Sequence, residues 1–278
     1  MKNAIATWKW SLGVVARSPA ALVVVGAVAA LWGFGAYQWL WLPESSGLLL
    51  LLALVWAIVQ IAIAVAFFAA TTTAAVGAAT SDTKQIEVRR LLGFSRSQYW
   101  RCLAWGAISL VLLLVFFYFF RWTDDHALEV ASFLTFQSEK PVSPVTVGKV
   151  IWIFQMLIWI IVGGFLLSSL AHLLREGWTE TRHQAMRILG GCCWRTPFWT
   201  GLLSVGVFGG LAWPLATWHP KVSAGFSDYA QMLVRMGGAL LFILTGWQFW
   251  LLSLARFNFP PDKPPVEPAV TPSSESST

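Results

Sequence analysis

The chain has 278 residues, of which 57% are hydrophobic and only 12% are charged, and its mean hydropathy is +0.65. Soluble globular proteins contain about 25% charged residues, so this composition excludes an ordinary water-soluble fold. The formal net charge of +6 reflects basic loops beside apolar spans rather than a basic surface, and nucleic acid is therefore not an expected partner.

Six long stretches of the sequence contain almost no ionisable residue. A helix needs about 20 apolar residues to cross about 30 Å of hydrocarbon. The strands of a membrane barrel would alternate apolar and polar residues, whereas these stretches are continuously apolar. The sequence therefore predicts an all-α, polytopic transmembrane bundle in one domain over residues 1–258. The expected spans are residues 19–41, 48–76, 103–121, 148–173, 197–218 and 229–255.

The basic residues of the predicted loops fall mainly on one side of the spans. With the N-terminus inside, fourteen of the nineteen Lys and Arg residues lie in inner segments. The positive-inside rule then predicts an inner-membrane protein with both termini in the cytoplasm. Residues 259–278 are rich in Pro and Ser and read as a disordered cytoplasmic tail. The inner basic residues are Lys2, Lys9, Arg17, Lys84, Arg89, Arg90, Arg96, Arg101, Arg175, Arg182, Arg187, Arg195, Arg256 and Lys263.

Each pair of spans follows a cytoplasmic segment in which apolar residues recur at helical spacing among basic ones. Amphipathic helices of this kind lie in the membrane interface. In the first segment, the stripe consists of Ile5, Trp8, Leu12 and Val15; the second and third segments cover residues 84–101 and 182–195. A Leu-Gly pair recurs in each segment, at Leu12-Gly13, Leu92-Gly93 and Leu189-Gly190. The pattern indicates either a threefold repeat of interfacial helix and hairpin, over 1–77, 84–175 and 178–256, or a chance recurrence.

The interiors of the spans contain many aromatic residues and few polar ones. The chain has 18 tryptophans, and the mid-span Trp32, Trp56 and Trp159 either pack between helices, which we expect, or face a pigment, a quinone or lipid. No ionisable residue lies at the middle of a span, which argues against a proton-coupled carrier. Gln60 and Gln155 are the candidates for lining a path for a neutral or amphiphilic substrate.

Two glycines in the fifth span predict a close helix contact, and the positions of the three cysteines predict that no disulfide forms. Gly206 and Gly210 form a Gly-x-x-x-Gly pair, which favours close approach to a neighbouring helix in the same chain or in another one. Cys102, Cys192 and Cys193 are expected at the cytoplasmic face as free thiols.

Residues that carry chemistry elsewhere are sparse in this sequence. The acidic cluster at Asp124, Asp125, His126 and Glu129 has the groups for a divalent cation or acid–base chemistry, but it lacks an established ligand spacing, so we expect a solvated outer loop. His172 is isolated and is either a macrocycle ligand or an ordinary interfacial residue. No phosphate-binding loop, nucleophile elbow or zinc-protease motif occurs. We therefore predict no catalytic residue, no metal site, no cofactor and no enzymatic activity.

One cytoplasmic segment carries a family-like motif. Residues 84–98 contain the pattern Arg-x-Leu-Gly-x-Ser-Arg-x-Gln, and they resemble the cytoplasmic segment of FtsX/MacB-type ABC transporter permeases. Gln85 stands where that family has an acidic residue, the family's large external domain is missing between the first two spans, and two additional spans follow. The matching residues are Arg90, Leu92, Gly93, Ser95, Arg96 and Gln98. The resemblance implies a docking surface for a partner ATPase at Lys84, Arg89, Arg90, Gly93, Ser95 and Arg96.

Two functional classes remain compatible with the sequence. In the first, the chain is a permease-like subunit for a hydrophobic or amphiphilic substrate, driven by a separate cytoplasmic ATPase. In the second, it is a membrane scaffold or accessory subunit without transport activity. The expected partners are the lipid bilayer, such an ATPase or other membrane subunits, and further copies of the chain.

Overall fold

The computed structural model describes residues 2–40, 46–81, 85–217 and 226–261, and the regular structure within these ranges is entirely helical. Six helices there are long and apolar enough to cross a membrane, so the predicted all-α polytopic architecture is confirmed. The membrane-length helices are α2 (Pro19–Leu40), α3 (Gly47–Thr80), α5 (Arg96–Asp125), α7 (Pro144–Arg175), the continuous α9 (Thr196–Ser204), η1 (Val205–Gly209) and α10 (Gly210–Thr217), and α11 (Phe226–Asn258). The shorter helices are α1 (Lys2–Ala16), α4 (Val88–Leu91), α6 (Ala127–Ser138) and α8 (Trp178–Trp194).

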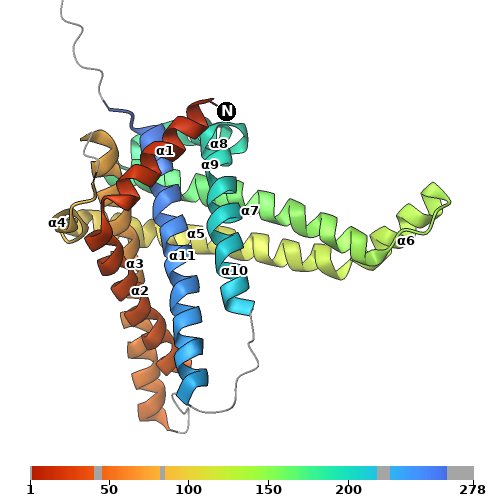
Figure 1. Ribbon diagram of the computed structural model, residues 1–278, viewed down its shortest axis with the longest axis horizontal. Coiled ribbons are helices and arrows are strands. Elements are labelled where there is room, and N and C mark those ends of the chain that lie inside the picture. The colour runs from red at the N-terminus through yellow and green to blue at the C-terminus, as the bar shows by residue number, and fades with distance from the viewer. Residues whose placement is uncertain (1, 41–45, 82–84, 218–225, 262–278) are drawn as a thin grey trace, which may run out of the picture.

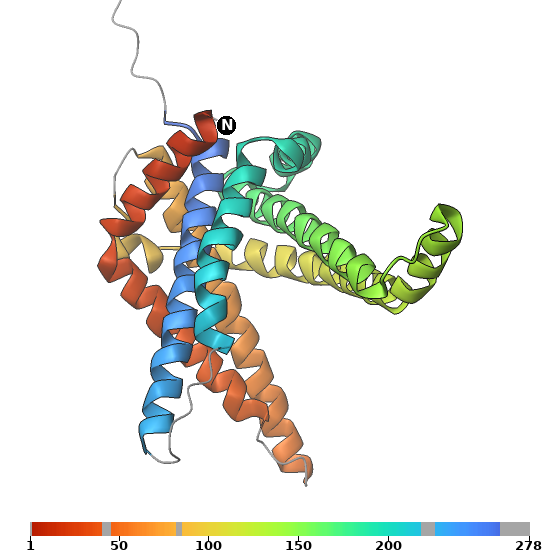
Figure 2. The ribbon, with the colours of Figure 1, turned by 45° about the vertical axis from the view of Figure 1, so that its right-hand side comes forward.

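The six long helices form three hairpins that share one end of the molecule. The hairpins α2–α3 and α10–α11 run in the same general direction, whereas α5 and α7 leave the bundle at a large angle as a separate arm that ends in α6 (Figures 1 and 2). The N-terminal helix α1 and the C-terminal end of α11 lie together at the shared end (Figure 1). Both described ends of the chain therefore lie on the same side, as an even number of spans requires.

Several helices extend beyond the apolar stretches that predicted them. The third membrane-length helix, α5, begins at Arg96 because Ser95 and Gln98 form a reciprocal capping box. In this box each side chain accepts a hydrogen bond from the backbone N–H of the other residue. The fourth begins at Pro144, a residue suited to a first helical turn. Between them, the predicted outer loop contains α6, which folds back against α7. Hydropathy locates the part of a helix within hydrocarbon, whereas capping residues set its ends.

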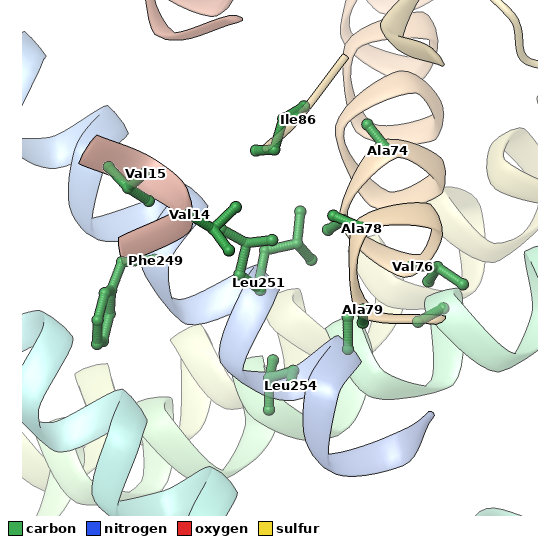
Figure 3. Packing of buried hydrophobic residues seen from close by; sticks show 14 of the residues in the cluster. Val14, Val15, Ala74, Val76, Ala78, Ala79, Ile86, Phe249, Leu251 and Leu254 are labelled. Carbon is green, nitrogen blue, oxygen red and sulfur yellow. The ribbon is translucent and has the colours of Figure 1, made fainter. Parts of the chain in front are cut away.

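The core lies where the shared ends of the hairpins meet. Figure 3 shows Val14 of α1 beside Leu251 of α11, with Ala78 and Ala79 of α3 facing them. These alanines let α3 approach α11 closely, while the other ends of α2 and α3 expose their leucines. An aqueous protein would not leave such a surface uncovered. Its apolar character fits contact with lipid chains along the outer parts of the hairpins.

The first amphipathic segment is a helix, but its apolar stripe does not form one lipid-facing surface. Trp8 and Val15 face the bundle, with Trp8 edge-on to Phe249, while Ile5 and Leu12 are 47% and 40% exposed. Ser11, fully buried, also shares a hydrogen bond of 2.9 Å with Ser253 Oγ. Because α1 packs against α11, it belongs to the core as much as to the interface.

The second amphipathic segment, residues 84–101, is not a single helix. Only Val88–Leu91 forms a short helix before the chain turns through Gly93 and begins α5, because the capping box at Ser95 starts a new helix there. The third segment does form a helix, α8. Each hairpin is thus preceded by a helix at the shared end, although α4 is far shorter than α1 and α8. Lys84 and most of the predicted tail lie outside the described residues.

Candidate functional site

A cavity of about 340 Å³ lies between the α5–α7 arm and the C-terminal hairpin. Its lining comes from α7, from the π-helical turn η1 and from α11, so it joins the parts of the molecule that diverge in Figure 2. We call it the aromatic cavity. Its lining residues are Trp152, Gln155, Met156, Trp159, Ile160, Val205 and Trp250.

Trp250 is held between two helices by glycines. A Cβ on Gly163 of α7 would lie 2.8 Å from Trp250 Cη2, and a Cβ on Gly201 of α9 would lie 2.9 Å from Trp250 Nε1. Contacts this short leave no room for any side chain. These two glycines therefore allow the indole to insert between α7 and α9 and to form the inner wall of the aromatic cavity.

The α-helical pattern is interrupted where the fifth span borders the cavity. Residues Val205–Gly209 form a turn of π-helix, a feature that frequently occurs at functional sites. Just before it, the buried Ser204 Oγ donates a hydrogen bond of 2.6 Å to the Gly246 carbonyl of α11. Gly246 in turn admits Phe208, whose Cβ would lie 2.8 Å from a Cβ at that position. The irregular turn is thus fixed against α11 on both of its sides.

Gln155 is the polar residue of the cavity lining, and the arm orients it. Its Nε2 donates to Asp124 Oδ1 at 2.9 Å and to Thr123 Oγ1 at 3.1 Å, both at the end of α5. The amide N–H groups are thereby occupied within the arm. The Oε1 atom is left as the group that can accept a hydrogen bond from a ligand with a hydroxyl or ammonium group.

Gln60, the other candidate for a substrate path, lies elsewhere. Its side chain packs against Gly35 within the α2–α3 hairpin, and its backbone carbonyl accepts the indole N–H of Trp32 at 3.0 Å. Trp56 likewise donates to the Gly35 carbonyl at 2.9 Å. Trp32 and Trp56 therefore contact the facing helix, although they remain 41% and 39% exposed. The structure does not bring Gln60 and Gln155 to one path.

Trp159 plays a double role, since it packs between helices and also borders the cavity. Its ring lies 5.4 Å from that of Phe120 and 6.4 Å from that of Phe116, both on α5. It remains 36% exposed. Helix packing thus holds one part of the indole, and the remainder is available to a ligand.

The segment that resembles ABC permeases contains both structural and exposed residues. Arg90 is bound internally, to Glu87 at 3.2 Å and to Ser81 Oγ at 3.2 Å, and Ser95 caps α5. Arg89 and Arg96 have no ion-pair partner within 4.0 Å among the described residues and are exposed. Of the predicted docking residues in this segment, Arg89, Gly93 and Arg96 are therefore the ones that are exposed and have no structural contact of this kind.

The other residues with chemical potential have local structural partners. The His126 ring packs at a tilt against Trp122, with ring centroids 4.5 Å apart, and its Nε2 lies 3.9 Å from Glu129 Oε2. Asp125 lies 3.9 Å from Arg121. Within the described part of the chain, no group of three His, Cys, Asp or Glu side chains has an arrangement that could hold a metal ion.

Gly206 and Gly210 make no close contact among the described residues, since a Cβ at either position would meet no atom within 4 Å. The close approach to a helix of the same chain, one of the two alternatives for this pair, is therefore not seen there. Around the aromatic cavity, the close approaches occur instead at Gly163, Gly201 and Gly246. None of these glycines belongs to a Gly-x-x-x-Gly pattern.

Trp250 and Val205 were not identified as site residues from the sequence. Trp250 lies near the inner end of its span, where an interfacial tryptophan is ordinary, and Val205 resembles any aliphatic residue of a membrane helix. The small residues facing Trp250 were visible in the sequence, but only the tertiary contacts pair them with it.

No family model, curated protein or solved structure matches the chain. The fold therefore defines the class: a multi-pass membrane protein whose six apolar helices form three hairpins, with a cavity at the junction of two of them.

Proposed function

We propose that the chain is a non-enzymatic, permease-like membrane subunit that binds a hydrophobic or amphiphilic substrate in the aromatic cavity. The observation that carries this proposal is the composition of the cavity wall, which is formed by three tryptophans, three aliphatic or thioether side chains and one amide. Ligand sites are commonly lined in this way, with a few polar groups that orient the ligand.

The cavity favours an amphiphile with a hydrogen-bond donor at its polar end. The indoles of Trp152, Trp159 and Trp250 offer flat apolar surfaces to a chain or ring system. Gln155 Oε1 is the acceptor, and the carboxylate of Asp124 beside the amide adds a negative charge that favours an ammonium or hydroxyl group. A carboxylate headgroup would be repelled at the same place.

The divergence of the arm gives such a substrate a lateral route. The sides of α7 and of the C-terminal hairpin carry exposed apolar residues such as Phe154, Val207 and Leu211. Lipid chains can occupy the space between these surfaces in a bilayer, and the cavity lies where the surfaces meet. A substrate dissolved in the membrane would reach Gln155 without crossing water.

Energy for transport would come from a partner, because the sequence offers no nucleotide-binding motif. The resemblance of residues 84–98 to ABC permeases implies that the ATPase would contact this segment. The exposed Arg89, Leu92 and Arg96 are the residues that such a partner could reach. Leu92 is 76% exposed, which gives the contact an apolar anchor between two cations.

The binding step is tested by photocrosslinking with two matched probes. One is a diazirine-bearing long-chain amino alcohol, and the other is a diazirine-bearing fatty acid methyl ester of equal chain length, which lacks a donor. The amino alcohol should crosslink within residues 152–160, and Q155L or W159A should reduce this labelling severalfold. W213A, at a tryptophan that is 71% exposed and outside the cavity, is the control. Equal labelling by both probes in all variants would refute the proposed site.

The partner step is tested by affinity purification in mild detergent followed by mass spectrometry. An ATPase should copurify with the native chain and be lost from R89E/R96E. Arg90 is left unchanged, because its contacts with Glu87 and Ser81 make any loss at that position ambiguous. Recovery of other membrane subunits alone, unaffected by R89E/R96E, would favour the alternative function.

That alternative is a scaffold or accessory subunit, and one observation favours it. Helix α6 lies beyond the predicted span and exposes Leu128, Phe133 and Phe136 by 63%, 63% and 87%. Exposed apolar side chains of this size on a short helix are typical of a protein contact. L128S/F136S would disrupt a complex held by α6 while leaving crosslinking in the aromatic cavity unchanged.

A further inference from the structure

A second cavity, separate from the aromatic one, lies at the shared end of the hairpins. It has a volume of about 270 Å³, and its lining comes from the ends of α7 and α11, from α8 and from the junction of α8 with α9. We call it the basic cavity. Its lining residues are His172, Gln184, Arg187, Ile188, Arg195, Phe257 and Asn258.

Two guanidinium groups of the basic cavity have no acidic partner. Neither Arg187 nor Arg195 lies within 4.0 Å of a carboxylate among the described residues, and both are exposed. Other arginines at this end do have partners: Arg175 lies over the ring of Phe259, and Arg256 donates to the Ala79 carbonyl. The charge of the cavity is thus available to an external anion.

The inner wall of the cavity contains buried polar groups. His172 is only 4% exposed, and its Nδ1 lies 2.8 Å from Glu176 Oε2, which fixes the ring. Asn258 Nδ2 is buried and has no hydrogen-bond partner within the described residues. A buried donor without an acceptor is unfavourable. Asn258 thus adds an unpaired amide donor to the wall of the cavity, and this observation is independent of the two arginines.

The carboxylates nearby are already engaged. Glu176 binds His172, and Glu180 accepts a hydrogen bond from the Gln184 side chain. Their charges reduce the attraction for any anion, so the two guanidinium groups without an acidic partner must supply the binding. Arg187 and Arg195 line the cavity and are exposed, and guanidinium groups can form paired hydrogen bonds with phosphate oxygens.

The volume and position of the basic cavity limit the size of the ligand. Drug-sized ligands occupy cavities of about 300–1,000 Å³, so about 270 Å³ accommodates a headgroup rather than a complete lipid. Helix α8 lies at the same end of the bundle as α1 (Figure 1), where a membrane-spanning fold meets the headgroup region. Ile188 and Phe257 provide apolar wall on which a glycerol backbone can rest.

We infer that the basic cavity is a binding site for a phosphate monoester or similar phosphate group, recognised by Arg187, Arg195 and Asn258. The phosphate belongs either to the headgroup of an anionic lipid or to a small soluble phosphate. The inference does not depend on the proposed transport function, since the two cavities share no lining residue.

The test uses the full chain purified in mild detergent, titrated and analysed by native mass spectrometry. The probes are dioleoyl phosphatidic acid, dioleoylglycerol, which has the same chains without the phosphate, and inorganic phosphate as a competitor. Phosphatidic acid should bind and dioleoylglycerol should not. R187Q/R195Q should weaken phosphatidic acid binding by about tenfold or more, and N258A should weaken it to a smaller extent.

Controls separate this site from general surface charge and from the aromatic cavity. R89Q/R96Q removes two exposed arginines elsewhere at the same end and should leave binding unchanged, as should W159A. Displacement of the lipid by millimolar inorganic phosphate would identify a site for free phosphate, while resistance to it would identify a lipid headgroup site. Equal binding of dioleoylglycerol, native binding in R187Q/R195Q, or an equal loss in R89Q/R96Q would overturn the inference.

Discussion

Gly201 is a position at which the packing of the helices admits no side chain. A Cβ there would lie 2.9 Å from both Ile160 Cγ2 and Trp250 Nε1. G201A is therefore expected to destabilise the protein by about 1–3 kcal/mol, because overpacking forces neighbouring groups apart. The measurement is the thermal unfolding midpoint of the purified full chain in mild detergent.

Gly210 provides the matched control within the same membrane span. A Cβ at this position meets nothing within 4 Å, so G210A should leave the midpoint unchanged or raise it slightly, since alanine favours a helix over glycine. The ordering of the two variants is the result that matters. If G210A lowered the midpoint as much as G201A, the insertion of Trp250 would not explain the requirement for glycine.

At the scale of elements, the α2–α3 hairpin is joined by indole hydrogen bonds. Trp32, Trp39 and Trp56 each donate to a backbone carbonyl of the facing helix, at 2.9 to 3.0 Å. Phenylalanine keeps most of the apolar area but cannot donate. W32F and W56F should each cost about 0.5–1.5 kcal/mol, measured by the same thermal unfolding. W213F, at an exposed tryptophan, should be neutral, and a similar loss there would point to aromatic area instead of hydrogen bonding.

The sequence predicts the membrane-length helices well, but it does not predict the short helix α6. Continuous apolar stretches locate all six membrane-length helices, because the hydrocarbon imposes a minimum length on each of them. Helix α6 was predicted as loop because Ser132, Thr135 and Ser138 interrupt its apolar residues, yet each hydroxyl bonds to the carbonyl four residues earlier. Such local bonds satisfy the polar groups without ending the helix.

The candidate sites were less predictable than the helices. Gln155 was identified because a polar side chain inside an apolar span is conspicuous, but its bond with Asp124 depends on the packing of α7 against α5. Trp250 becomes a site residue only through glycines on two other helices. A sequence without aligned relatives contains no signal that pairs such positions, so cavities between helices remain invisible to it.

At the scale of the whole molecule, helix lengths make the divergent arm compatible with a bilayer. The 32 residues of α7 extend about 48 Å, well beyond about 30 Å of hydrocarbon. The 22 residues of α2 extend only about 33 Å. A long helix can cross at a steep tilt, whereas a short one must remain near the membrane normal. The arm can therefore lean away from the other hairpins and leave apolar space beside the aromatic cavity.

The orientation of this assembly is predicted by its charge distribution and can be tested with thiols. Cys193 is exposed on α8 at the shared end, and Ser138 is exposed at the end of α6, at the far end of the arm (Figure 1). If the shared end is cytoplasmic, a membrane-impermeant maleimide should label S138C in intact cells. Cys193 should react only after the cells are permeabilised.

Cys192 should not be labelled under either condition, so the labelling of the native chain reports on Cys193 alone. Burial raises the pKa of its thiol to about 12, so at neutral pH very little of this thiol is the reactive thiolate. C193S should abolish the signal of the native chain, because the other two cysteines, Cys102 and Cys192, are buried. The opposite result, labelling of Cys193 in intact cells and of S138C only after permeabilisation, would reverse the predicted topology. The surface that carries Arg89, Arg96 and the basic cavity would then face outward. No cytoplasmic ATPase could reach it there.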